Sequence, residues 1–149
     1  MANTISSIRV ENLDRLAATF AQNIVRCAKS AKEAGDLDNL VTKTLGVLQE
    51  NGVYAAILFL ASQRQDKQRE QAQRVMDEIL NLLDDMNTKF TFKWSSKPDP
   101  TVSEEVLRYI SSQVVVNLER LLLAKETLEQ MLIYTRYGAK ARKAEGDDR

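Results

Sequence analysis

The stretch that decides the fold is NGVYAAILFLASQRQDKQRE, residues 51–70. Every residue of 53–61 is apolar, whereas every residue of 63–71 is charged or carries an amide. The Asn51-Gly52 step is a turn signal, and because its flanks have helical spacing we interpret it as the junction of two helices. A helix that is apolar on all sides is typically buried. We therefore expect 53–61 to be the central rod of a helical bundle and the charged stretch to be its rim.

The segment before this stretch contains two helical patterns. Over residues 12–33 apolar side chains recur every three or four positions, which predicts an amphipathic helix. Gly35 follows where a left-handed C-terminal cap is expected. Asp36 or Asp38 can then cap a second helix that ends at the turn signal, because a short acid accepts the free N–H groups of a helix start.

The segment after the stretch contains two longer patterns. Helical spacing returns over 72–86. Residues 87–100 break this period, and their alternating aromatic and polar side chains suit a short extended segment. Thr101 and Glu104 have the spacing of a capping box, so another long helix is expected there. Its β-branched run 114–116 predicts a kink or break.

Together these patterns predict an all-α fold, a single-domain bundle of five to six helices over residues 1–149. A chain of 149 residues fits one domain with a substantial core. Its five glycines and two prolines are few, which favours long helices with few breaks. We expect residues 1–10 and 144–149, approximately, to be flexible.

The composition argues against catalysis and against a bound cofactor. The chain has no histidine, which removes the commonest general base and the commonest metal ligand. Its single cysteine, Cys27, lies on the apolar face of the first predicted helix and is expected to be a small core residue rather than a nucleophile. The sequence contains neither a Gly-rich phosphate loop nor a Ser or Cys nucleophile motif. We therefore expect a protein that is not an enzyme and that holds no cofactor and no metal.

Charge and hydropathy also limit the partners. Lys plus Arg and Asp plus Glu both total 21, so attraction to a polyanion must come from local patches. The apolar run 53–61 is far shorter than the roughly 20 residues that cross a bilayer, and the N-terminus has no secretory signal. The single cysteine cannot form an internal disulfide, which favours a reducing compartment. We therefore expect a soluble cytoplasmic protein without a membrane partner.

Three groups of basic residues are candidates for RNA binding, because cations that follow a nucleic-acid backbone release its counterions. Each group also fits a solvated helix face with ion pairs between neighbouring turns. In sequence, the group nearest the C-terminus is the least diluted by acids. Tyr134 and Tyr137 lie beside it, where they can stack on bases or cover the edge of the core. The candidates are Arg15, Arg26 and Lys29; Arg64, Lys67 and Arg69, with Arg74; and Arg136, Lys140, Arg142 and Lys143.

Two stretches of the chain resemble a known family. LGVLQENGVYAAILFLASQ (45–63) resembles the leucine-rich approach, Asn-Gly step and apolar helix of the small helical subunit of the type III-B CRISPR effector, the RAMP-module complex. LLAKETLEQMLIYTRYGAKARK (122–143) resembles the C-terminal helix of that subunit, which usually carries a Lys-Arg-aromatic-Ala step. Together they cover about 40 of the 149 residues, and elsewhere only the helix order agrees. The basic step reads Thr135-Arg136-Tyr137-Gly138-Ala139 here, so a threonine replaces the lysine and a glycine intrudes.

The resemblance implies a non-catalytic subunit of an antiviral ribonucleoprotein. Small subunits of this family stack into an inner filament, beside the backbone subunits that hold the guide RNA and near a large polymerase-like subunit. They help to line the basic channel for the duplex of guide RNA and target RNA, which the backbone subunits cut. The implied partners are therefore the CRISPR guide RNA, the target RNA, the other effector subunits and further copies of the chain.

Two alternatives also fit the sequence. One is a helical oligomerising adaptor or scaffold with no nucleic-acid role, in which the long apolar stripe of the C-terminal helix would be an intersubunit seam. The other is the equivalent small subunit of a type III-A complex, which shares the general architecture. The Asn51-Gly52 step and the long C-terminal helix favour type III-B.

Overall fold

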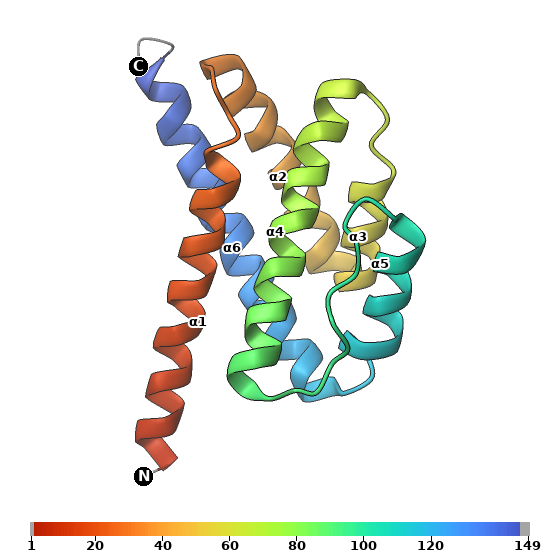
Figure 1. The fold of residues 1–149 in the computed structure, drawn as a ribbon. Helices are drawn as coiled ribbons and strands as arrows, with labels where there is room; N and C mark the ends of the chain where they lie inside the picture. Colours follow the sequence, from red (N-terminus) through yellow and green to blue (C-terminus); the bar gives the residue numbers. More distant parts are fainter. Residues whose placement is uncertain (1, 147–149) are drawn as a thin grey trace.

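A computed structural model describes residues 2–146, with side chains from Leu13 onward. Over these residues the chain forms six α-helices, one turn of π-helix and no strand, which confirms the predicted all-α bundle (Figure 1). The elements are α1 (Ala2–Val25), α2 (Ala31–Asn51), α3 (Val53–Ala61), α4 (Asp66–Phe90), α5 (Ser103–Tyr109), the π-helical turn η1 (Ile110–Val114) and α6 (Leu118–Glu145).

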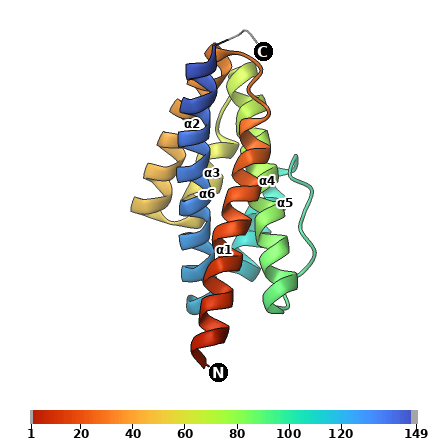
Figure 2. The ribbon, with the colours of Figure 1, turned by 90° about the vertical axis from the view of Figure 1, so that its left-hand side faces the viewer.

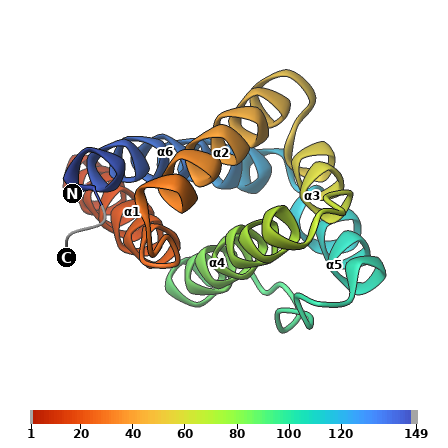
Figure 3. The same cartoon turned by 90° about the horizontal axis from the view of Figure 1, so that it is seen from above.

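Four long helices make the body of the bundle. Helices α1 and α6 lie side by side and run in the same direction, whereas α2 and α4 run the opposite way (Figures 1 and 2). Helix α6 packs mainly against α1 and α2. The short helices α3 and α5 pack together at one side, and α3 joins them to the bundle by packing against α2 and α4 (Figure 3). None of the helices between residues 2 and 146 combines the length and apolar character that a bilayer span requires.

The prediction of one helix over 12–33 is wrong, because the chain breaks between α1 and α2. Ser30 caps α2: its Oγ accepts a hydrogen bond from the Glu33 N–H at 3.1 Å. The Glu33 carboxylate reaches back and accepts from the Lys29 N–H at 3.2 Å. This Ser-x-x-Glu spacing resembles a capping box and was visible in the sequence. Gly35 and Asp36 consequently lie inside α2, and neither they nor Asp38 cap a helix.

Helix α3 has the predicted bounds but not the predicted position. Gly52, with φ of +95°, separates it from α2, a conformation that glycine adopts without a steric penalty. The helix lies at the side of the bundle rather than at its centre (Figure 3). Its buried face carries Val53, Ala56, Ile57 and Leu60, whereas Tyr54 and Leu58 are 43% and 46% exposed. An unbroken apolar run therefore marked a helix with one buried face only.

The aromatic segment after α4 anchors a long connection across the bundle. No strand forms there, because Thr91 and Lys93 both have positive φ. Phe92 and Trp94 are nevertheless buried, with their ring centroids 4.9 Å apart. The Asn87 side chain fixes the turn, since it accepts from the Trp94 N–H at 2.9 Å and donates to the Trp94 carbonyl at 3.1 Å.

The predicted capping box at Thr101 does not form. Instead, Thr101 donates both its N–H and its hydroxyl to the Asp99 carboxylate, at 2.9 and 2.6 Å, and α5 begins at Ser103. An aspartate two residues before a donor makes such a local turn readily. The predicted break is confirmed: the helix passes into η1, and α6 starts afresh behind the cap residue Asn117.

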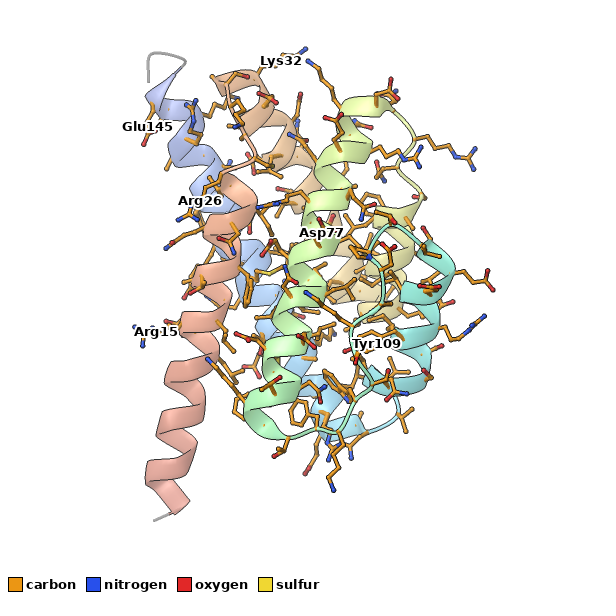
Figure 4. All side chains as sticks on the ribbon, viewed as in Figure 1. Arg15, Arg26, Lys32, Asp77, Tyr109 and Glu145 are labelled. Atoms are coloured by element: carbon orange, nitrogen blue, oxygen red, sulfur yellow. The ribbon has the colours of Figure 1, made fainter. Side chains whose placement is uncertain are left out.

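Replacing Tyr109 with phenylalanine is expected to stabilise the protein. The Tyr109 hydroxyl is buried and has no hydrogen-bond partner among the described residues (Figure 4). Removing such a group should raise the free energy of unfolding by about 1 kcal/mol in urea denaturation at pH 7. No change, or a loss of stability, would mean that the hydroxyl is satisfied.

The same variant should change the response to alkaline pH. Burial, helped by the charge of Asp84, raises the pKa of Tyr109 to about 12. The unfolded chain loses this proton near pH 10, so the wild type should lose stability as the pH rises from 10 to 12. The phenylalanine variant should lack this component, and denaturation curves at pH 9 and 11 measure it.

Candidate nucleic-acid interface

Arg15 and Arg26 define the exposed side of α1. Both side chains are exposed and extend outward from the bundle (Figure 4). Arg26 directly follows α1, and its N–H still donates to the Gln22 carbonyl at 3.1 Å. It stands eleven positions after Arg15, which on a continued helical path corresponds to about 16 Å along the axis and to within about 20° of one line. Gln22 is exposed between them, and the Arg26 guanidinium donates to Asn23 at 3.3 Å. No carboxylate whose side chain the structure describes forms an ion pair with either arginine.

A groove runs beside this line of arginines, between α1 and α6. Its volume is about 460 Å³, and its lining includes Ala18, Arg26, Tyr134 and Gly138. The two helices approach closely at Gly138 in this groove, where an added Cβ would lie 2.8 Å from a methyl group of Val25. A cation and an aromatic side chain therefore share one apolar groove.

The two tyrosines predicted near this surface differ in their environments. The Tyr134 hydroxyl donates to the carboxylate of Asp14, and this bond raises the pKa of Tyr134 above its usual value. Tyr137 is 63% exposed, so the interpretation that it covers the edge of the core is wrong. Its ring is free to stack on a planar group.

Lys29 does not continue the α1 line, because the helix ends before it. It lies in the connection to α2 with its side chain exposed. Both polar groups of its backbone form hydrogen bonds: the N–H donates to the Glu33 carboxylate, and the carbonyl accepts from Arg142 at 3.0 Å. The half-buried Cys27 lies nearby, and burial raises the pKa of its thiol.

The four residues of the second basic group differ in whether acidic side chains lie beside them. Arg64 and Arg69 line a hollow that contains no acidic side chain. Lys67 lines another hollow together with Glu33, Asp36 and Glu70. Arg74 lies 3.9 Å from the Glu78 carboxylate. Arg64 in the α3–α4 connection and Arg69 in the first turn of α4 are therefore the members of this group whose hollow contains no acid.

The third group is partly neutralised, although its sequence contains few acids. Asp38 on α2 forms ion pairs with both Arg136 (3.7 Å) and Lys140 (3.1 Å). Arg142 is buried and donates to the backbone carbonyls of Lys29 and Gly146, so the prediction that it faces RNA is wrong. Lys143 is exposed, and its side chain extends over Gly35.

The structure thus does not bring the eleven predicted residues onto one path. Helix α1 and the α3–α4 connection lie on opposite sides of the bundle (Figures 1 and 3). Of the predicted residues, those with exposed side chains and no ion pair to a described acid are Arg15, Arg26 and Lys29 on or just after α1, Arg64, Lys67 and Arg69 near the start of α4, and Lys143 on α6. No cluster of three or more Cys, Asp or Glu side chains suited to a metal ion occurs among the described side chains.

Comparison with known proteins adds no assignment. No protein-family model matches the chain, and neither a curated protein nor a solved structure matches it. The resemblance to small CRISPR subunits therefore remains a prediction from the residues of 45–63 and 122–143.

Proposed function

We propose that this chain is a non-catalytic, RNA-associated small subunit of a type III-B CRISPR effector complex in the cytoplasm. It would stack with further copies into a filament, next to the backbone and polymerase-like subunits. Its basic side chains would contact the sugar-phosphate backbone of the guide RNA or target RNA without reading sequence.

The observation that carries this proposal is the α1 face. Arg15 and Arg26 point outward along one line, with no described carboxylate to neutralise them. Phosphate binding requires cations arranged along a path, and each contact releases a counterion. Tyr137, exposed on the neighbouring helix, offers a ring for stacking. A single copy presents few such contacts, so affinity would come from repetition along a filament.

One observation that favoured the adaptor alternative, the apolar stripe of α6, no longer does so. The apolar stripe of α6 was its candidate seam, but Leu128, Met131 and Leu132 are buried within the chain. Leu118 and Leu122, which are 68% and 54% exposed, remain available at the start of α6. In the proposed complex these two residues are candidates for contacts between neighbouring copies or subunits.

The RNA contact is tested by two variants that change the net charge equally. Arg15→Gln with Arg26→Gln removes two uncompensated cations, whereas Arg136→Gln with Lys140→Gln removes two cations that already face Asp38. Fluorescence anisotropy with a labelled single-stranded RNA should show weak, sequence-independent binding by the wild type. The first variant should bind about tenfold more weakly and should reduce the slope of log K against log salt by about 1.4.

The control variant should bind almost as the wild type does. Equal losses in both variants, or binding that does not depend on salt, would contradict the proposed interface. Assignment to a type III-B complex rests on the genes beside this one, which should encode RAMP-type backbone subunits and a large polymerase-like subunit.

A further inference from the structure

The hollow at the α3–α4 connection is a second basic site, remote from the α1 face. It has a volume of about 370 Å³, within the range of small-molecule sites. Three elements enclose it: the end of α3, the first turns of α4 and the chain leading into α5. Its lining comprises Leu60, Ala61, Gln63, Arg64, Arg69, Ala72, Gln73, Met76, Pro100, Thr101 and Ser103.

The walls of this hollow are held in place by hydrogen bonds. Gln73 on α4 donates to the Pro100 carbonyl at 2.7 Å, which ties the connection before α5 to α4. Gln63 donates to the Phe59 carbonyl at 3.0 Å and so fixes the chain just after α3. The Arg69 N–H donates to the Gln65 carbonyl in the first turn of α4. These bonds hold the chain at Gln63, directly before Arg64, and at Arg69.

Three of the acids near the hollow are engaged elsewhere. Asp99 accepts two hydrogen bonds from Thr101, which lower its pKa. Glu104 pairs with Arg108 at 3.0 Å, and Asp77 accepts from Gln73 at 3.2 Å. The lining itself contains no carboxylate, and neither Arg64 nor Arg69 forms an ion pair with a described acid.

We propose that this hollow binds the dianionic phosphate group of a phosphate monoester or of free phosphate, held between Arg64 and Arg69. A guanidinium presents a planar fork of N–H donors that matches phosphate oxygens. Two such charges balance a group that carries close to two negative charges at pH 7, whereas one carboxylate supplies only one. The Ser103 hydroxyl adds a donor at the wall, and Leu60, Ala72 and Met76 supply an apolar floor that strengthens the charge interaction.

The test uses the full chain and a matched pair of variants. Arg64→Gln with Arg69→Gln removes both charges of the hollow, whereas Lys67→Gln with Arg74→Gln removes two charges from the same segment that face acids instead. Inorganic phosphate is titrated into ¹⁵N-labelled protein. We expect saturable shifts of the Arg69, Gln73 and Ser103 amides. Affinity should fall about tenfold or more in the first variant and little in the second.

Two RNA oligonucleotides of one sequence, with and without a 5′-phosphate, then identify the source of the phosphate. Tighter binding of the phosphorylated RNA, lost in Arg64→Gln with Arg69→Gln, supports a terminal phosphate of a nucleic acid. Inorganic phosphate that binds as tightly as the phosphorylated RNA supports free phosphate as the ligand.

Absence of saturable phosphate binding would overturn the proposal, as would equal losses in the two variants. Equal binding of both oligonucleotides without binding of inorganic phosphate would also overturn it. Arg15 and Arg26 are unchanged in these variants, so a failed phosphate titration would not count against the proposed α1 interface. A failed RNA-binding test of the Arg15 and Arg26 variant would likewise not count against this phosphate site.

Discussion

Replacing Gly138 with alanine should destabilise the protein, although alanine is the better helix former. The added Cβ would lie 2.8 Å from Cγ2 of Val25, closer than atoms in a packed interior can approach. Overpacking of this kind typically costs about 1–3 kcal/mol, which exceeds the gain of about 1 kcal/mol in helix propensity. Urea denaturation should therefore show a net loss of about 1–2 kcal/mol.

Gly46 provides the matched control for this prediction. It lies inside α2, and a Cβ there would meet no atom within 4 Å. Gly46→Ala should raise the free energy of unfolding by up to about 1 kcal/mol. Adding Val25→Ala to Gly138→Ala should cost less than the sum of the two single changes, because the clash disappears. Strict additivity would show that α1 and α6 do not make this contact.

Truncation of Phe92 should cost more than any surface change in the molecule. Phe92 is buried beside Trp94, and the Arg120 guanidinium lies 5.2 Å from the centre of its ring. Arg120 also donates to the Phe92 carbonyl. Phe92→Ala should lower the free energy of unfolding by about 3–5 kcal/mol and should increase amide hydrogen exchange along residues 91–102.

Phe92→Leu separates the two contributions of this ring. Leucine keeps an apolar side chain in the core but removes the cation–π contact, which is worth about 1 kcal/mol. We therefore expect Phe92→Leu to retain most of the stability lost in Phe92→Ala. Equal losses in both variants would mean that the ring contacts, rather than burial, hold this connection.

The sequence predicts the helices of this chain well and their packing less well. Periodicity and turn signals locate α3 at its observed bounds and place the break before α6, because both signals depend on residues close together in the chain. The side position of α3 depends instead on where α2, α4 and α5 lie, which no local pattern contains. The missed cap at Ser30 is different, since its Ser-x-x-Glu spacing was available.

The candidate site was harder to predict for a similar reason. The group Arg136, Lys140, Arg142 contains no acid in its own segment, yet Asp38 lies against it across the bundle. Such long-range pairing depends on the fold, and sequence separation of about 100 residues hides it. Conversely, the hollow that Arg64 and Arg69 line forms where the chain before α5 is tied to α4, and no pattern in residues 63–71 indicates it.

The parallel arrangement of α1 and α6 has a mechanical consequence. The two helices lie side by side, but α1 begins at one end of the bundle and α6 finishes at the other (Figures 1 and 2). Tension applied between the start of α1 and the end of α6 therefore slides one helix along the other. Their contacts must then rupture together in shear instead of peeling apart one turn at a time.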